Sequence, residues 1–404
     1  MIGILGDSLA RYVSILAAAI RPSPGQRVPS IRRVVVMVAF VPVFTAAQLI
    51  HWLGFLLDEI LFPGYRRVPV KEPLFVLGIP RSGTTLMHRV LARDPNMTTF
   101  STWECFLAPS ITQRRLVLGL ARADRAVGRP LGRLLGLVER RVFGGLDSVH
   151  PMDLSAPEED YLALLPVMAC FVLVIPFPMA EPLWTMATFD RDMPEARRRR
   201  LMTFYRRLLQ RHLYVHGPDK RLLSKNAAFA GMAGALRETF PDARFVRCHR
   251  DPRAVVPSQL SSIRGGVAVF DSDPGGRVFT ARMIEVLRVY HTNLNTHLPF
   301  PAGDRHVTLD MAHFKEDLVG TVRGVYERLG LPMTEAFADR LEDEAREARA
   351  YRSGHTYAAA DFGLDESAIA AIFGTVQDRE GDSKDTAPAM PVGAPSVPVG
   401  QKGP

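Results

Sequence analysis

The stretch FVLGIPRSGTTLMHRVLARDP, residues 75–95, constrains the fold more than any other part of the chain. The apolar run at 74–77 predicts a short strand, and Leu86, Val90 and Leu91 fall on one side of the helix that follows a Gly-rich turn. Backbone N–H groups at such a helix start lack intrahelical partners, and the helix dipole adds partial positive charge there. Strand, turn and helix therefore predict a binding site for an anionic group.

The turn departs from the nucleoside-triphosphate loop G-x-x-x-x-G-K-[ST] at one position. Gly78 and Gly83 have the required spacing, but Thr84 stands where that loop has lysine, and Arg81 is the only cation within the turn. Two interpretations stay open at this point. The turn is either the degenerate loop of a kinase or NTPase, or a loop for a different phosphorylated donor.

A second basic turn follows a predicted strand in RFVRCHRDPRAVVPSQLSS, residues 244–262. Arg250 and Ser258 are eight residues apart, so an arginine fork and a hydroxyl can hold a phosphate from two sides. A basic strand end is also compatible with a plain solvated surface. Strand and helix alternate again at HVTLD, 306–310, and we therefore expect an α/β fold with a central parallel sheet flanked by helices.

Taken together, the two turns resemble those of sulfotransferases that use 3′-phosphoadenosine-5′-phosphosulfate (PAPS). The resemblance runs from about residue 61 to about residue 373 and implies the P-loop NTPase-like sulfotransferase fold. It assigns the 5′-phosphosulfate to the first turn and the 3′-phosphate to the second. The residues that it implies for donor binding are Pro80, Arg81, Ser82, Gly83, Thr84, Thr85, Arg250 and Ser258, with Tyr357 as a further contact beside His355.

The resemblance also implies in-line transfer of a sulfuryl group to a hydroxyl. We expect no metal ion, because a sulfuryl group carries less charge than the γ-phosphate that Mg²⁺ neutralises in kinases. Arg81 and Lys225 are the implied catalytic cations. Glu104, in TFSTWECF, is the first choice for the base, and Glu158 or Glu159 of APEEDY is the alternative. A surface position for Glu104, and a helix cap with acidic first-turn residues for APEEDY, explain the same carboxylates.

Residues 34–62 form the longest apolar region, which Pro42 divides. In 43–62 the polar side chains fall within an arc of about 140° on a helix. This pattern predicts either an amphipathic helix packed on a domain or lying at a membrane surface, or a helix that spans the membrane. A second apolar run, 163–184, is interrupted by prolines and predicts core or the wall of a site for an apolar acceptor, not one continuous spanning helix.

The charge balance favours anionic partners. The chain has 50 Lys and Arg against 42 Asp and Glu, a net charge of +8, which suits anionic ligands or anionic lipid. The basic residues are scattered without a base-reading motif, so nucleic acid is not an expected partner. The basic helix expected at 194–212 has either a solvated face or a lipid-contacting one. Three separated cysteines favour a reducing compartment.

The sequence therefore predicts four parts. These are an N-terminal segment that is poorly ordered or helical (1–33), the apolar helix (34–62), a sulfotransferase domain (63–376) and a disordered Pro- and Gly-rich tail (377–404). The expected protein is a cytoplasmic sulfotransferase, peripheral to or anchored at a membrane, with a small-molecule or lipid-like hydroxyl acceptor. A kinase or NTPase with a degenerate loop and a non-enzymatic membrane adaptor are the alternatives.

Overall fold

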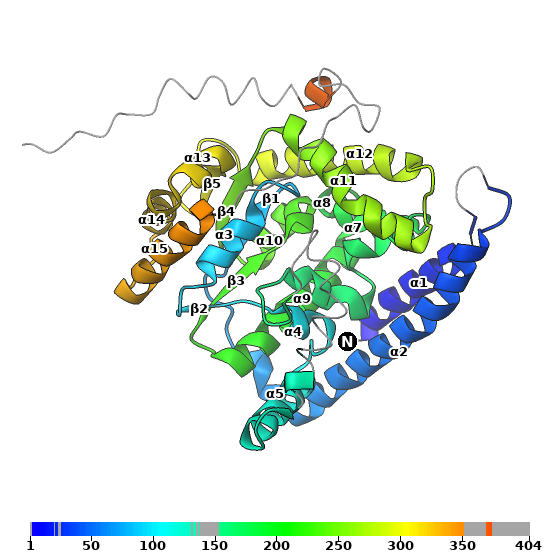
Figure 1. Cartoon of the computed structure of the whole chain (residues 1–404), viewed down its shortest axis with the longest axis horizontal. Helices are drawn as coiled ribbons and strands as arrows, with labels where there is room; N and C mark the ends of the chain where they lie inside the picture. Colours follow the sequence, from blue (N-terminus) through cyan, green and yellow to red (C-terminus); the bar gives the residue numbers. More distant parts are fainter. Residues whose placement is uncertain are drawn as a thin grey trace, which may run out of the picture.

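The fold is built on one parallel sheet. The structure, a computed structural model, describes residues 2–19, 21–22, 26–130, 132–134, 136, 153–350 and 369–373. Its sheet has five strands in the order β2-β3-β1-β4-β5, and all neighbouring strands run parallel (Figure 1). The strands are β1 (Leu74–Gly78), β2 (Met97–Thr98), β3 (Arg221–Lys225), β4 (Arg244–His249) and β5 (His306–Asp310). The predicted parallel α/β fold is confirmed. Tyr357, His355 and the tail 377–404 lie outside the described residues.

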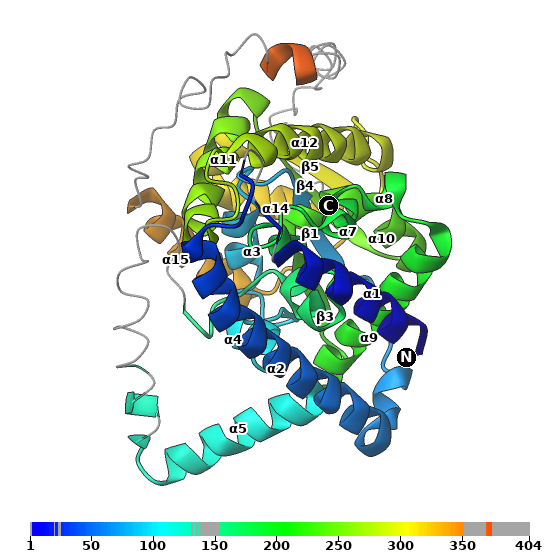
Figure 2. The ribbon, with the colours of Figure 1, turned by 90° about the vertical axis from the view of Figure 1, so that its right-hand side faces the viewer.

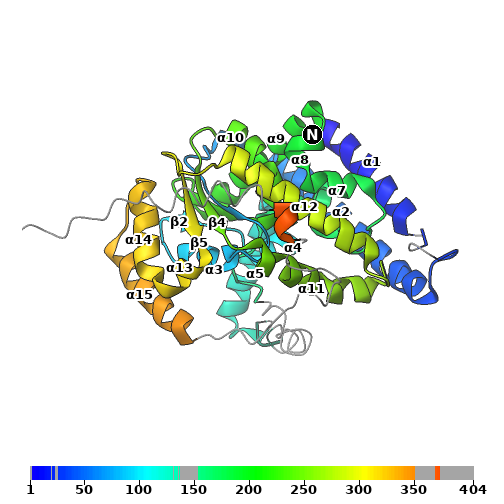
Figure 3. The same cartoon turned by 90° about the horizontal axis from the view of Figure 1, so that it is seen from above.

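Alternate residues of β1 face two different cores, as the two-residue repeat of a strand requires. Leu74 and Val76 pack in the smaller core, under helices α3 (Thr84–Leu91), α13 (Met311–Glu316), α14 (Leu318–Arg328) and α15 (Glu335–Ala350). Phe75 and Leu77 pack in the larger core on the opposite face. Figure 3 shows α14 and α15 at one side of the sheet and α9, α10 and α12 at the other. Helices therefore cover both faces.

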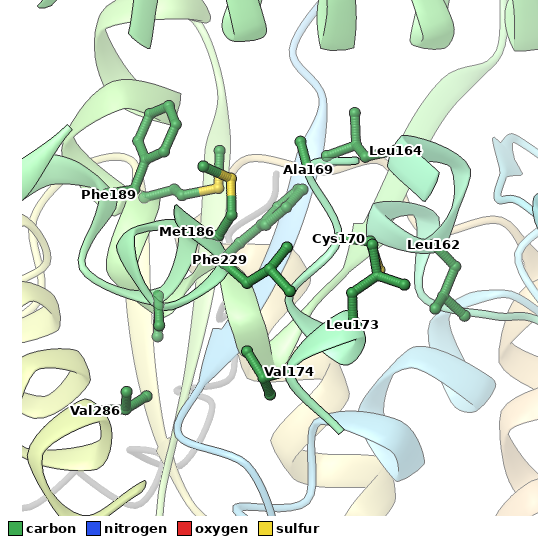
Figure 4. Packing of buried hydrophobic residues seen from close by; sticks show 14 of the residues in the cluster. Leu162, Leu164, Ala169, Cys170, Leu173, Val174, Met186, Phe189, Phe229 and Val286 are labelled. Atoms are coloured by element: carbon green, nitrogen blue, oxygen red, sulfur yellow. The ribbon is translucent and has the colours of Figure 1, made fainter. Parts of the chain in front are cut away.

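A further group of helices and turns lies on the side of the larger core. These are α4 (Thr102–Phe106), α5 (Ile111–Ala126), α7 (Glu181–Ala187), α8 (Phe189–Asp192), α9 (Glu195–His216), α10 (Ala233–Thr239), α11 (Pro252–Phe270) and α12 (Arg277–His297), with 3₁₀ turns η1 (Pro63–Arg67), η2 (Asp160–Val167), η3 (Phe171–Val174) and η4 (Ala227–Met232). The apolar run 163–184 becomes η2, η3 and the start of α7, so it is not one helix. Figure 4 shows its side chains meeting Phe229 and Val286 in this core.

Two N-terminal helices lie at one edge of the molecule (Figure 2). Helix α1 (Ile2–Ala19) falls within the segment expected to be poorly ordered or helical. Helix α2 (Ile31–Leu61) begins three residues earlier than the apolar region expected at 34–62 and continues through Pro42. Its N-terminus is capped by Ser30, whose hydroxyl accepts from the backbone N–H of Arg33 at 3.1 Å. Within the described residues, α2 alone is long and apolar enough to cross a membrane, and only 22% of its most apolar window is buried.

Candidate active site

The sheet order places the first Gly-rich turn between two other strand ends. Strand β1 pairs with β3 on one side, where Val76 lies opposite Lys225, and with β4 on the other, where Gly78 lies opposite Cys248. Ligands of open α/β sheets bind at the carboxyl ends of the strands. The residues that follow β1, β3 and β4 are therefore the ones that a ligand at this edge would meet.

The turn after β1 depends on two glycines. A Cβ on Gly78 would collide with Ser82 Oγ and the carbonyl oxygen of Cys248. Gly83 has φ +86°, in the left-handed region, and a Cβ there would overlap the Met311 sulfur. Gly83 is also the N-cap of α3, and none of the described side chains caps this helix. The N–H groups at the start of α3 therefore remain available for an anion.

Ser82 gives the turn a buried polar atom that needs a partner. Its side chain is fully buried, and among the described residues its Oγ has no hydrogen-bond partner. An unpaired buried hydroxyl is costly unless something binds it. An anion held by the turn would satisfy Ser82 Oγ together with the free N–H groups.

The second basic turn contacts the first one directly. Arg81 Nε donates to Ser258 Oγ at 3.0 Å, and Arg250 Nη1 donates to the carbonyl oxygen of Arg81, also at 3.0 Å. Ser258 lies on α11, whose start is capped by the Asp251 carboxylate. Thus Arg81, Arg250 and Ser258, which the sequence analysis grouped at the donor, lie together. We call these three residues the Arg81–Arg250–Ser258 cluster.

The other basic residues of the second turn have different roles. Arg247 is buried and donates to the carbonyl oxygen of Leu298 at 2.9 Å. Arg253 forms an ion pair with Asp251 at 2.6 Å on the surface. Arg250, in contrast, donates its hydrogen bond to the first turn.

Lys225 links the end of β3 to the start of α3. Its Nζ donates to Glu159 Oε1 at 2.6 Å and to Thr85 Oγ1 at 3.3 Å. The Lys225 side chain is 5% exposed and that of Glu159 is 20% exposed. A carboxylate and an ammonium group thus stand beside the phosphate-type turn, and the carboxylate remains accessible.

Comparisons with known proteins agree with this geometry. The sequence profile of the sulfotransferase family matches residues 73–335. The chain belongs to the sulfotransferase family. The predicted family resemblance is thereby confirmed, and the match falls inside the domain expected at 63–376.

Two curated relatives carry the name omega-hydroxy-beta-dihydromenaquinone-9 sulfotransferase Stf3, one from Mycobacterium bovis and one from Mycobacterium tuberculosis. Each is 24% identical over 273 residues, which is 67% of this chain and 65% of the relative. Among solved structures, STF9 from Mycobacterium avium has a TM-score of 0.70 at 18% identity, covering 91% of this chain and 95% of that one. STF1 from Mycobacterium tuberculosis H37Rv has a TM-score of 0.64 at 21% identity, covering 93% and 92%. The solved structures establish the shared fold.

The chain holds Glu159 in place through its neighbour Asp160. The buried Asp160 carboxylate accepts from Tyr205 Oη at 2.6 Å and from Ser224 Oγ at 2.8 Å, and also from the amide of Asn226. Burial raises the pKa of Asp160, although these hydrogen bonds oppose the rise. The sequence analysis missed this network. It fixes the start of η2 against the end of β3, and so sets Glu159 opposite Lys225.

Glu104, the first choice for the base, lies in a different environment. It is buried, its Oε2 accepts from the Ser101 backbone N–H at 2.9 Å, and its Oε1 lies 3.0 Å from Arg114 Nε and 2.7 Å from His216 Nε2. Burial alone would raise the pKa of Glu104, but His212, Arg114 and the hydrogen bonds from the two histidines hold it well below its usual range. Burial also lowers the pKa of His212 to about 4, which makes Arg114 the lasting positive partner near neutral pH.

These contacts weigh against Glu104 as the base. A carboxylate with a low pKa and an ion pair to a buried arginine is a poor proton acceptor. None of the hydrogen bonds or ion pairs that the structure shows for Glu104 reaches the first turn or Lys225. The alternative surface position is also wrong, because its side chain is 3% exposed. Glu159, named as the alternative base, is the carboxylate at the turn.

Glu104, His212 and His216 also form the one group in the described residues that could hold a metal ion, with ligand atoms within 4.8 Å of one another. The Arg114 guanidinium already lies 3.0 Å from the same Glu104 oxygen. A divalent cation there would be placed beside a permanent buried positive charge. We therefore interpret the group as a structural ion-pair and hydrogen-bond network.

Proposed function

We propose that this protein transfers a sulfuryl group from PAPS to a hydroxyl of an apolar or amphipathic acceptor. The observation that carries the proposal is the pair of hydrogen bonds by which the second basic turn meets the first one, Arg81 to Ser258 and Arg250 to the Arg81 carbonyl. A donor with phosphate groups at both its 5′ and 3′ positions needs two anion sites at a fixed separation. The Arg81–Arg250–Ser258 cluster joins two such sites.

The chain's residues fit the two ends of this donor. The free N–H groups at the start of α3, the unpaired Ser82 hydroxyl and Thr85 suit the 5′-phosphosulfate. Arg250 supplies a fork of N–H donors for the 3′-phosphate, and Ser258 supplies a hydroxyl. Arg250 and Ser258 contact Arg81 through the polar atoms that would also bind the 3′-phosphate. A bound donor would therefore exchange these contacts for contacts with phosphate oxygens.

The proposed chemistry uses Glu159 and Lys225. Glu159 takes the proton of the acceptor hydroxyl as its oxygen forms the new bond to sulfur. The bond between sulfur and the bridging phosphate oxygen breaks, and the negative charge that develops on that oxygen is stabilised by Lys225 and Arg81. The 2.6 Å ion pair between Glu159 and Lys225 places the proposed base directly beside the proposed cation.

Two observations support the proposed acceptor. The curated relatives are named as sulfotransferases of an omega-hydroxy menaquinone derivative. In this chain, the residues that follow Glu159 form η2 and η3, which are almost wholly apolar. We propose a lipid-like molecule with a terminal hydroxyl as the acceptor, and a reaction on the cytoplasmic side of a membrane.

The kinase or NTPase alternative is less well supported. The nearest candidate for a magnesium-binding carboxylate after a strand is Asp310, at the end of β5. Its Oδ1 accepts from the Ala312 backbone N–H at 2.7 Å and caps α13. This role accounts for an aspartate at the end of a strand without a metal ion.

The test compares Glu159→Gln with Glu158→Gln. Both changes remove one negative charge from adjacent residues, but only Glu159 contacts Lys225, whereas Glu158 accepts from the Glu159 backbone N–H at 2.8 Å. Transfer of radiolabelled sulfuryl from PAPS to long-chain alcohols and isoprenoid hydroquinones, without Mg²⁺, measures turnover. Calorimetry with adenosine 3′,5′-bisphosphate measures donor-site binding.

We expect Glu159→Gln to lower turnover by roughly 10²-fold or more, because general-base catalysis contributes that much. Its affinity for adenosine 3′,5′-bisphosphate should stay within about threefold of the wild type, since Glu159 is not at the proposed phosphate contacts. Equal turnover of the two variants would remove Glu159 from the mechanism. A wild-type protein that binds ATP with Mg²⁺ but not the bisphosphate would refute the proposed function.

A further inference from the structure

Helix α2 places its polar side chains toward the protein and its apolar side chains toward the outside. Its buried polar residues are Arg33, Gln48, His51 and Asp58. On a helix, its exposed large apolar residues fall within about half of the circumference, which puts them along one side. They are Ile31, Val34, Val35, Val38, Val43, Leu49, Ile50, Leu53, Leu56, Ile60 and Leu61.

The inward polar side is bonded to the protein at both ends of the helix. Near the start, Arg33 Nη2 donates to the Ala18 carbonyl oxygen at 3.2 Å. Near the end, Asp58 Oδ2 lies 2.9 Å from Arg211 Nε, and both side chains are 0% exposed. Breaking such a buried ion pair would leave an uncompensated charge in the interior. Helix α2 therefore cannot leave the domain to span a bilayer without losing its anchors.

Helix α1 extends the apolar surface. Leu5, Leu9, Val13 and Leu16 are exposed at steps of three and four residues. Figures 1 and 2 show α1 beside α2, and the hydroxyls of Tyr12 and Thr45 are hydrogen-bonded across the two helices. We define the docking surface as these four α1 residues together with the eleven exposed apolar residues of α2. Apolar patches of this extent are unusual on monomeric soluble proteins.

The charges around the docking surface are positive. Among the described residues of 2–62, every exposed charged side chain is an arginine, namely Arg21, Arg27 and Arg32. The acidic side chains of this segment are paired with arginines of the domain: Asp7 with Arg200 at 2.7 Å, and Asp58 and Glu59 with Arg211 at 2.9 and 2.8 Å.

This charge pattern distinguishes between two occupants of the docking surface. A second copy of the chain would bring like charges together, whereas an anionic bilayer would complement them.

We propose that the docking surface inserts into the headgroup region of an anionic membrane, with α1 and α2 lying in the membrane plane. A 31-residue helix is about 46 Å long, so in the plane it presents its whole apolar side to the acyl boundary. The inward polar residues remain bonded to the domain. The sequence alone is compatible with a membrane-spanning helix and with an interfacial helix. The bonds between the polar side of α2 and the domain favour the interfacial helix.

Docking at a membrane would also bring the active site close to a lipid-like acceptor. This consequence rests on the proposed function, whereas the docking itself does not. Trp52 Nε1 donates to the Pro166 carbonyl oxygen at 2.8 Å, so α2 packs directly on η2. The N-cap of η2 is Glu159. The docked membrane would thus lie one layer of structure away from the base, and a lipid-like acceptor would reach the site without crossing water.

Vesicle flotation tests the docking. The probes are vesicles of phosphatidylcholine alone and vesicles of equal parts phosphatidylcholine and phosphatidylglycerol. The test variant carries Leu49→Glu, Leu53→Glu and Leu56→Glu, and the matched control adds the same charge at exposed positions of α12 and α15, as Thr292→Glu, Thr296→Glu and Ala336→Glu. A further variant, Arg27→Gln with Arg32→Gln, tests the charge contribution. Thermal unfolding followed by circular dichroism checks that each variant is folded.

We expect the wild type and the control to float with anionic vesicles, and the Leu49, Leu53 and Leu56 variant to lose at least about tenfold in partitioning. The Arg27 and Arg32 variant should lose its preference for anionic over neutral vesicles. No flotation of the wild type, or equal flotation of the three-leucine variant, would overturn the proposal. So would a stable dimer that the leucine changes dissociate without any vesicle binding, because the occupant would then be a second copy.

Depth measurements separate an in-plane helix from a spanning one. The three native cysteines are buried, so a fluorophore on Val38→Cys, Ala46→Cys or Leu53→Cys is selective. Positions 38 and 53 are about 22 Å apart along a helix. We expect spin-labelled lipids to quench all three fluorophores at the same shallow depth. A depth that changes through the bilayer centre between these positions would overturn the in-plane arrangement.

Discussion

The most direct test of the donor site removes the group assigned to the 3′-phosphate. Arg250→Ala deletes the guanidinium that donates to the Arg81 carbonyl oxygen, and Ser258→Ala deletes the hydroxyl that accepts from Arg81 Nε. Arg253→Ala is the matched control, because Arg253 belongs to the same turn but pairs with Asp251. The two arginine changes remove the same charge at nearly the same place.

The magnitude follows from the type of bond lost. A hydrogen bond to a charged group contributes about 1.5–3 kcal/mol, and a neutral one about 0.5–1.5 kcal/mol. Arg250 lies on an exposed turn, so solvent screening favours the lower end, which corresponds to about tenfold in Kd. For Ser258→Ala we expect about two- to tenfold. Arg253→Ala should change Kd by less than about twofold.

The assay is calorimetry with two nucleotides. Adenosine 3′,5′-bisphosphate carries the 3′-phosphate, and adenosine 5′-monophosphate lacks it. The ratio of the two affinities isolates the 3′ contact from any general loss of binding. We expect Arg250→Ala to reduce this ratio about tenfold while leaving the affinity for the monophosphate unchanged.

Two results would refute the reasoning. If Arg250→Ala weakened both nucleotides equally, Arg250 would act on the first turn and not on the 3′-phosphate. If Arg253→Ala matched Arg250→Ala, the effect would be the general charge of the turn. Raising the salt concentration in the wild type should lower the affinity ratio, because an exposed ion contact is screened.

Three further predictions concern stability and the turn. Glu104→Gln leaves buried Arg114 without its counter-charge, so we expect urea denaturation to show a loss of about 3 kcal/mol with nucleotide affinity unchanged. Burial mainly lowers the pKa of His212 from 6.5 to about 4, so the unfolded chain binds more protons in that range. The free energy of unfolding should fall as pH drops from about 6.5 to about 4, and His212→Gln should flatten this part of the profile. Gly83→Ala, at φ +86°, should abolish nucleotide binding by calorimetry, whereas Gly119→Ala on exposed α5 should not.

The elements that the sequence predicted well carry local signals. The apolar run before the first turn, its two glycines and the following helix are contiguous, and together they specify strand, turn and helix. The contact between Arg81 and Ser258, which are 177 positions apart, could not be predicted from the local sequence pattern. It arises because β1 and β4 are neighbours, an order that the sequence left open.

The Glu159–Lys225 pair shows where local reasoning stops. These residues are 66 positions apart, and Glu158, Glu159 and Asp160 are chemically alike in sequence. Which of them contacts Lys225 depends on the direction in which each side chain points from the backbone. Asp160 is drawn into the core by Tyr205 and by residues of β3, and this leaves Glu159 at the surface of the site.

The capping role of Glu104, in contrast, was available from the sequence. Residues 101–104, STWE, are the S-x-x-E pattern of a capping box, which uses the glutamate side chain to accept from the N-cap backbone. The histidines at 212 and 216 are four residues apart on a predicted helix, so they share one face. Their meeting with Glu104 was not predictable, because it depends on how α9 packs beside α4.

Helix α2 illustrates a different limit. The periodicity of its sequence separates a polar side from an apolar side, but it does not specify which side faces the protein. In most helices on a domain the apolar side is inward. Here the inward side contains Asp58, and the deciding group is the buried Arg211 of α9, 153 positions away. The apolar side is left outward, where each exposed Å² forgoes about 25 cal/mol of burial. A membrane interface is the environment that recovers this energy without breaking the Asp58–Arg211 pair.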